Sequence, residues 1–598
     1  MSTTAPAVPT APAVAVADEL DGLLAERLTP ALLAALDRDE EFPAGPLALL
    51  DAFGLPAHYV PAEHGGRLTD HEVLLGLWRT LARRDLTLAV AHGKTYLGTA
   101  PVWIAGSERQ CRELAGRVLG GARVAWALSE PGHGADLLAN EATAVRTGSG
   151  SGSGDGTDNT DNTDGWRLDG TKWPINNATR GSHLTVLART GEPGHPRAHS
   201  LLLVDKAALD PAAHRPLPKA RTHGIRGVDI SGIEFTGAVL PADALLGAEG
   251  TGTETVLRAL QLTRTMCAAL SLGAGEHALR LTAEFAAERI IQQKPLAERA
   301  HVRAVLARCG ALLAATEAAA ITGVRSAHAL TGELSVVSAV VKGLAPTLVD
   351  GLIGELAELL GSRSFLTDVY RDGAFQKVWR DHQIVAVFDG STPVNRNALA
   401  LQFPRLVRSF AAGTADAEGL AEAAAAGTPP RPLDRTALAL LSRTGCSTVQ
   451  SLPALAAELA VDGAPEALLD QVRDLVGLAD ELHWRLAEVR PAAHPEHEAY
   501  ELAAGYELLY AAAAALRLWH ANRAGHPDEP LWQDALWIRA ALRELLGRLA
   551  ARLDREAPAA AADDDLLTDR MAAAVLRGVR EHTPVTPFGT PLATEDQS

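Results

Sequence analysis

The sequence is poor in aromatic residues and in positive charge, and each shortage excludes a class of protein. Aromatic residues make up 4% of the 598 residues, and 55 Lys and Arg face 73 Asp and Glu, for a formal net charge of −18. Nucleic-acid surfaces need clustered Lys and Arg, so we expect no nucleic-acid partner. A small anionic ligand remains compatible with this charge, because it needs only a local basic pocket or a helix N-terminus.

Cysteine is also scarce, and the four cysteines form no Cys-x-x-Cys pair. This spacing argues against a metal knuckle or a redox dithiol, so we expect no metal site. We interpret the four as buried, reduced thiols of a cytoplasmic protein. The first Lys or Arg is Arg27, which is unlike a secretory signal. No stretch approaches the roughly 20 apolar residues that a membrane-spanning helix needs.

Helical and strand-like patterns occupy separate parts of the chain. In "DHEVLLGLWRTLARRD", Val73, Leu77 and Leu81 form one helical stripe. Short runs such as "VAWAL", "HLTVLART" and "ISGIEFTGAVLP" then predict strands, and helical patterns return after Gly252. Clustered strands favour an α+β fold over a doubly wound sheet.

Changes of composition divide the chain further. "AAGTADAEGLAEAAAAGTPPRP" is typical of a linker, and apolar stripes beyond it predict packed helices. The predicted parts are a disordered tail (1–18), an N-terminal helical domain (19–122), a small β-barrel-like domain (123–246) with a flexible polar loop (148–165), a helical bundle domain (247–412), the linker (413–430) and a C-terminal helical domain (431–598).

One carboxylate stands out in the apolar stretch "VAVFDGSTPVNRNALA". Asp389 is followed directly by Gly390. This pattern indicates either a surface turn or a base with room beside it for a substrate, and the stretch alone does not decide between them.

Five stretches in order resemble the acyl-CoA dehydrogenase family between about Gly54 and Arg408. They are "GLPAHYVPAEHGG", "WALSEPGHGADL", "LDGTKWPINNA", "GIRGVDISGIEFTGAVLPADALLG" and "WRDHQIVAVFDGSTPVNR". The resemblance implies FAD as cofactor and α,β-dehydrogenation of an acyl thioester, carried by CoA or by an acyl carrier protein. A carboxylate takes the α-proton, and flavin N5 accepts the β-hydride.

By this resemblance Asp389 falls on the catalytic glutamate, and Gly390 leaves space for the thioester and the flavin. Aspartate is shorter by about 1.5 Å, and misplacing a base by ~1 Å can cost ~10²-fold in rate. Some relatives place the base on the middle helix before an arginine; here Thr263 precedes Arg264. We expect Asp389 and Arg264 to be catalytic, although Arg264 could equally lie on a helix surface, and Gly390 and Thr263 to contact substrate.

The resemblance places Leu128 and Ser129 on the strand that faces the flavin ring. Gly134 corresponds to the glycine that lets the backbone approach the FAD pyrophosphate. Ala135 stands where a serine is usual, which removes one hydroxyl donor.

Further FAD contacts are implied on a second strand and on the helical bundle. Pro174 replaces a tryptophan, Ile175 is retained, and Asn176 replaces a threonine but keeps an amide donor that could reach the flavin. Arg289 matches an arginine that reaches the neighbouring subunit's FAD. Gly361 alone is retained where a Gln-x-x-Gly-Gly motif embraces the adenine half.

The C-terminal helices resemble the extension of the very-long-chain acyl-CoA dehydrogenases. That resemblance implies a homodimer, and the family implies an electron acceptor such as electron-transfer flavoprotein. Two other functions stay open: a flavin monooxygenase on the same scaffold, which retention of Asp389 disfavours, and an inactive binding or scaffold homologue, which Ala135, Pro174 and Gln293 keep open.

Overall fold

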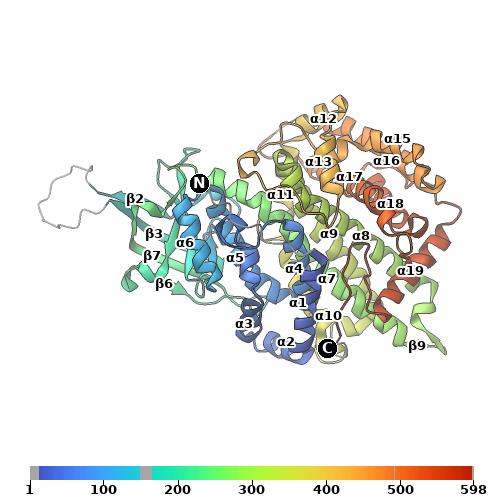
Figure 1. The fold of residues 1–598 in the computed structure, drawn as a ribbon, viewed down its shortest axis with the longest axis horizontal. Helices are drawn as coiled ribbons and strands as arrows, with labels where there is room; N and C mark the ends of the chain where they lie inside the picture. The colour runs from blue at the N-terminus through green and yellow to red at the C-terminus, as the bar shows by residue number, and fades with distance from the viewer. Residues whose placement is uncertain (1–12, 149–163, 491, 595–598) are drawn as a thin grey trace, which may run out of the picture. The chain divides into compact units, whose positions relative to one another are not determined.

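The computed structural model describes residues 13–148, 164–490 and 492–594 and forms two compact units (Figure 1). The helical unit comprises Met1–Ala34, Thr69–Leu86 and Arg264–Ser598, and the β-containing unit comprises Ala35–Leu68 and Thr87–Thr263. The predicted α+β class, with strands confined to the middle of the chain, is confirmed.

The β-containing unit holds three helices and the main sheet. Its elements are α3 (Ala44–Phe53), α5 (Leu86–Ala105), α6 (Glu108–Leu119), β1 (Val124–Ala127), β2 (Thr143–Thr147), β3 (Gly165–Asn176), β4 (His183–Arg189), β5 (His199–Asp205), β6 (His214–Leu217), β7 (Ile230–Pro241) and β8 (Leu245–Leu246).

The sheet has eight strands in the order β6-β7-β3-β2-β4-β5-β8, with β1 paired in parallel to β4. Alternate side chains of these strands form one apolar core, which includes Trp166, Leu184 and Phe235. Strands β2 and β3 pair antiparallel up to Thr147 and Gly165. The chain therefore reverses direction between them, although most of the predicted polar loop, residues 149–163, lies outside the described residues.

The helical unit contains the remaining long helices, and the boundary between the units falls inside α2 and α7 and after the first residue of α5. Its elements are α1 (Ala13–Arg27), α2 (Pro30–Arg38), α4 (His71–Arg84), α7 (Gly252–Glu288), β9 (Ile290–Ile291), β10 (Lys294–Pro295), α8 (Ala300–Ala329), α9 (Leu334–Leu360), α10 (Ala374–His382), α11 (Thr392–Ala400), α12 (Phe403–Ala412), α13 (Ala417–Ala424), α14 (Ser447–Gln450), α15 (Leu452–Val461), α16 (Glu466–Glu488), α17 (His497–Asn522), α18 (Leu536–Arg552) and α19 (Asp564–Arg580).

Two expectations about the chain's organisation were wrong. Helix α1 begins inside the predicted tail of residues 1–18, because Leu20 and Leu24 give it an apolar face that is fully buried; residues 1–12 lie outside the described part. The predicted linker, 413–430, contains α13, whose Leu420 and Ala423 pack against the end of α8. In both places a short apolar face stabilises a helix that the Pro- and Ala-rich composition concealed.

Two described helical segments, Ala300–Ala329 and Thr331–Ser364, are long and apolar enough to cross a membrane by length and composition alone. Of their apolar windows, 89% and 83% are buried inside the protein, as in the core helices of soluble proteins, so they are weak evidence for a span. The sequence expectation overlooked them because charged residues such as Glu317 and Lys342 interrupt their apolar runs.

A buried charge cluster joins α4, α7 and α8 to the C-terminal strap, residues 583–594. Arg79 donates to Glu276, to Glu317 and to the Thr586 hydroxyl, and Arg83 donates to Glu276 and to carbonyls of the strap. Burial would raise the pKa of Glu276, but the neighbouring guanidinium groups outweigh it and hold that pKa well below its usual range. Buried arginines need hydrogen-bond acceptors, and the strap supplies several of them. These bonds anchor the strap to the helices.

Candidate functional site

Asp389 lies in a short loop between a 3-10 turn (Gln383–Ala386) and α11. Its backbone adopts the left-handed conformation, with φ +56°, and Gly390 follows with φ +100°. Aspartate tolerates this region better than most residues because its short polar side chain can bond locally. The side chain is half-buried. The loop thus presents the carboxylate on an unusual turn of the backbone.

Arg264, on α7, bonds the backbone of this turn. Its Nε donates to the Asp389 carbonyl oxygen at 2.9 Å. A Cβ on Gly390 would approach Arg264 Nη2 to 2.7 Å. The glycine therefore makes room for the guanidinium of Arg264, and its predicted contact with a substrate stays a prediction. Arg264 is 9% exposed, so the alternative of a helix-surface arginine is wrong. Burial lowers the pKa of Arg264, and the Asp389 charge opposes that effect.

Cys267 is a contact of Asp389 that the sequence interpretation missed. Its thiol donates to Asp389 Oδ2 at 3.6 Å. The signal was its position three residues after Arg264, which places both side chains on one face of α7. Thr263 lies on the same helix, fully buried, and its hydroxyl oxygen has no hydrogen-bond partner among the described residues.

The other predicted group lies in the β-containing unit, where the end of β1 meets β3. Buried Lys172 donates to the Leu128 carbonyl at 3.3 Å and to Glu130 Oε1 at 2.7 Å. The Trp173 amide donates to the Ser129 carbonyl at 3.0 Å. These bonds place Leu128 and Ser129 beside Lys172 and Trp173 of β3. Ile175 and Asn176 follow shortly after them on the same strand.

Glu130 and Lys172 are the residues that organise this junction. Glu130 also accepts the backbone amides of Glu141 and Ala142, so it ties the loop after β1 to the start of β2. Burial lowers the pKa of Lys172 to about 8, although Glu130 partly opposes the effect. This pair has no clear signal in the sequence, since Glu130 follows β1 in a loop and β3 also carries Arg167 and Asp169 beside Lys172.

Asn176 uses one N–H of its side-chain amide within the β-containing unit, and the predicted contact of its second N–H with a flavin stays a prediction. Its Nδ2 donates to the Val90 carbonyl at 3.2 Å, and its Oδ1 is buried without a partner among the described residues. The Trp126 ring nitrogen is also buried and unsatisfied there. Ile175 lies in the apolar core of the sheet. The unit therefore offers a ligand a buried acceptor at Asn176.

Gly134 and Ala135 are exposed in the loop after β1. A Cβ on Gly134 would meet no described atom within 4 Å. The protein's own packing therefore does not require glycine at this position, in agreement with a role that depends on a ligand approaching the backbone.

Arg289 follows the end of α7, and Gly361 follows the end of α9. The Arg289 side chain is exposed just beyond the helix, and its amide bonds to the Phe285 carbonyl. Gly361 ends α9 with φ +61°, and Arg363 in the following turn stacks over the Phe285 ring at 5.3 Å. The structure thus brings these two predicted residues to the same region of the helical unit.

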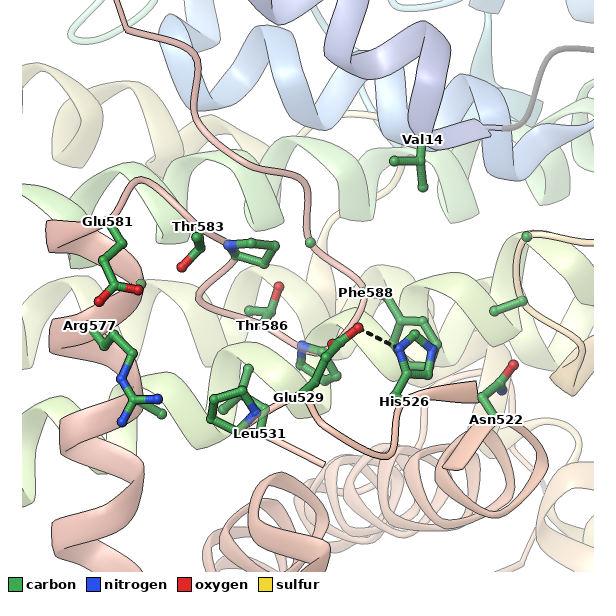
Figure 2. Close-up of a pocket in the computed structure, with 18 of the residues that line it drawn as sticks. Val14, Asn522, His526, Glu529, Leu531, Arg577, Glu581, Thr583, Thr586 and Phe588 are labelled. Atoms are coloured by element: carbon green, nitrogen blue, oxygen red, sulfur yellow. Dashed lines mark hydrogen bonds and ion pairs between the residues drawn. The ribbon is translucent and has the colours of Figure 1, made fainter. Parts of the chain in front are cut away.

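A cavity of about 570 Å³ lies elsewhere in the helical unit, between the ends of α17 and α19 and the C-terminal strap (Figure 2). No predicted site residue lines it. Glu529 pairs with His526, and Glu72 pairs with Arg325 and accepts the Gly427 amide, so these carboxylates are already engaged. We do not assign it to the reaction.

Three domain models of one family match the chain in order. They are "Acyl-CoA dehydrogenase, N-terminal domain" over residues 10–122, the "middle domain" over 125–238 and the "C-terminal domain" over 250–403. A probable acyl-CoA dehydrogenase of Mycobacterium bovis is 26% identical over 374 residues, which is 62% of this chain and 90% of the relative.

Solved structures share the fold. An acyl-CoA dehydrogenase from Bacillus anthracis, complexed with FAD, is 17% identical with a TM-score of 0.70 over 95% of both chains. A prolyl acyl carrier protein oxidase is 18% identical with a TM-score of 0.56, covering 65% of this chain and 97% of its own. The first similarity extends beyond the residues that the domain models match.

Proposed function

Because this chain belongs to the acyl-CoA dehydrogenase family, whose cofactor is FAD, we propose that it oxidises the Cα–Cβ bond of an acyl thioester with Asp389 as the base. It is a flavin-dependent oxidoreductase of the class that acts on CH–CH donors. The observation that carries the proposal is the half-buried Asp389 carboxylate on a left-handed turn whose carbonyl is held by buried Arg264.

The residues of the β-containing unit fit a flat group with polar edges. The unsatisfied Asn176 Oδ1 is suited to accept a hydrogen bond from such a group, and the open space beside Gly134 admits a close approach to the backbone. We assign the ring end of FAD to Leu128, Ser129, Ile175 and Asn176, and its phosphates to Gly134 and Ala135. By the family resemblance, Gly361 would lie against the adenine half, and Arg289 would reach the FAD of a neighbouring subunit. FAD, when bound, supplies the acceptor for the β-hydride.

Asp389 takes the α-proton, and its neighbours set its orientation. The Arg264 bond fixes the backbone at Asp389, and the Cys267 thiol bonds one carboxylate oxygen. A short carboxylate must be placed closely, since ~1 Å of displacement can cost ~10²-fold in rate. Gly390 and Thr263 are the proposed substrate contacts beside it.

The substrate's carrier and the partners belong to the same proposal. CoA and an acyl carrier protein present the same pantetheine arm, and one fold neighbour is named for an acyl carrier protein substrate. The electrons would pass to an acceptor such as electron-transfer flavoprotein, in the cytoplasm.

We also propose a homodimer. Apolar side chains near the end of α7 are exposed, and a second copy of the chain would cover them. They are Ile290, Ile291, Phe365, Leu366 and Val369.

The test is anaerobic bleaching of the bound flavin by a panel of acyl-CoA and acyl-carrier-protein thioesters. We expect at least one thioester to bleach it, and Asp389→Asn to slow bleaching by about 10²–10⁴-fold while FAD stays bound. Bleaching at the normal rate in Asp389→Asn would remove Asp389 as the base. Reduction that requires NAD(P)H, followed by oxygen consumption, would favour the monooxygenase instead.

A further inference from the structure

The segment that carries Asp389 is held by α9 before the loop and by α17 after it. Lys342 Nζ, fully buried, donates to the Val385 carbonyl at 2.6 Å, just before the loop. The next residue, Gly343, lies against Glu507 of α17, and a Cβ there would approach Glu507 Oε1 to 2.1 Å. Only glycine therefore lets Glu507 occupy this position.

Glu507 in turn holds α11, the helix that follows the loop. Its two carboxylate oxygens accept from Arg396 Nε at 3.1 and 3.2 Å and from Nη2 at 2.9 Å. The side chains of Glu507 and Arg396 are 2% and 15% exposed, so this forked pair is largely shielded from water. Because burial removes water from both charged groups, the pair is stable only if its hydrogen-bond geometry is good, which is less critical at a surface.

Arg396 is connected to Asp389 through its chain neighbour. Asn395 Nδ2 donates to the carbonyls of Gly390 and Ser391, both at 2.9 Å. A shift of Arg396 would therefore move the residues that directly follow Asp389. Glu507 itself lies beyond residue 403, where the match to the C-terminal domain model ends.

We propose that Glu507, in the C-terminal helices, is a positioning residue for Asp389: by holding Arg396 it keeps the Asp389 loop in its left-handed conformation. The inference rests on the proposed function for its catalytic consequence, but the effect on the loop is independent of it. The C-terminal helices are then part of the active-site geometry and not only an added packing surface.

The test compares Glu507→Gln with Glu458→Gln in the full-length holoprotein. Glu458 is also a carboxylate of the C-terminal helices paired with an arginine of α17, Arg517, but it lies at the surface. Cys267, 2% exposed and bonded to Asp389, reports on the loop: its alkylation by iodoacetamide is followed by mass spectrometry of the labelled peptide.

We expect Glu507→Gln to speed Cys267 alkylation at least tenfold and to slow thioester-driven flavin bleaching by about 10²-fold through kcat. Glu458→Gln should stay within twofold of the wild type on both. Arg396→Lys, which keeps the charge but loses the fork, should lie between them and serves if Glu507→Gln does not fold.

Unchanged Cys267 alkylation in folded Glu507→Gln, or equal changes in Glu458→Gln, would overturn the inference. If no thioester bleaches the wild-type flavin while Cys267 alkylation still rises in Glu507→Gln, the proposed reaction fails and the positioning of the loop stands.

Discussion

The Asp389 loop is held by side chains that bond its backbone, whereas the junction of β1 with β3 is held by the buried ion pair of Glu130 and Lys172. The backbone of the loop is bonded to Arg264, Lys342 and Asn395. Each region also keeps a buried oxygen without a partner among the described residues, Asn395 Oδ1 beside the loop and Asn176 Oδ1 at the junction. A native protein seldom leaves such a group unsatisfied without a reason. We therefore expect changes at the loop to act first on the placement of Asp389, and changes at the junction to act first on stability and on FAD retention.

The largest expected effect is at the junction, where Lys172→Met would leave the Glu130 carboxylate buried without its cation. Removing one partner of a buried ion pair typically costs about 3–5 kcal/mol, and urea unfolding would measure it. We also expect bound FAD to be lost during purification, because Lys172 fixes Leu128. Arg146→Met is the control: its pair with Glu249 is exposed and contributes only about 0–1 kcal/mol. Equal losses in the two variants would contradict the role of the buried pair.

At the loop, Gly390→Ala should reduce thioester-driven bleaching about 10²-fold, because the new methyl group would displace Arg264 and the turn. FAD content should not change. Gly413→Ala is a matched control, since Gly413 has φ +61° and nothing within 4 Å of its Cβ position, so it tests backbone strain alone. A normal rate in Gly390→Ala would show that the loop tolerates displacement.

The pH dependence of unfolding tests the support of the loop. Burial raises the pKa of Glu507 to about 7, although the charges of Arg396 and Arg552 oppose it. Between about pH 4.5 and 7, Glu507 stays protonated in the folded protein but has lost its proton in the unfolded chain. The contribution of Glu507 to the free energy of unfolding therefore falls as pH rises, by about 3 kcal/mol in total.

Glu507→Gln should lack this contribution. The difference in the free energy of unfolding between wild type and variant should therefore change across that pH interval and remain flat below and above it. A constant difference from pH 4 to pH 8 would show that Glu507 does not titrate there.

The smallest effect is expected at Asn176. Asn176→Leu removes the buried acceptor, so the stabilisation that saturating FAD adds should fall by about 1 kcal/mol. Urea unfolding with and without FAD measures this, and the variant without FAD corrects for the lost bond to the Val90 carbonyl. An unchanged FAD effect would mean that Asn176 Oδ1 is not completed by the cofactor.

Local patterns predicted the strands and the long helices because alternation and the 3.6-residue period are properties of neighbouring residues. They did not predict α13 or the start of α1, whose short apolar faces are stabilised by packing on distant helices. The same limit applied to Glu507, whereas Cys267 could have been found from its helical spacing to Arg264. Glu507 is 118 positions from Asp389 along the chain, and no spacing rule connects them.

By itself the sequence determined the order of helices and strands, the motifs that the family shares and Asp389 as the candidate base. The tertiary structure showed which side chain lies against the glycine beside it, which contacts Asn176 makes and which residues hold the loop. Those features depend on hydrogen bonds and close contacts between segments far apart in the chain. Such bonds are stronger in the buried interior, where the dielectric constant is low, and only the folded chain creates that interior.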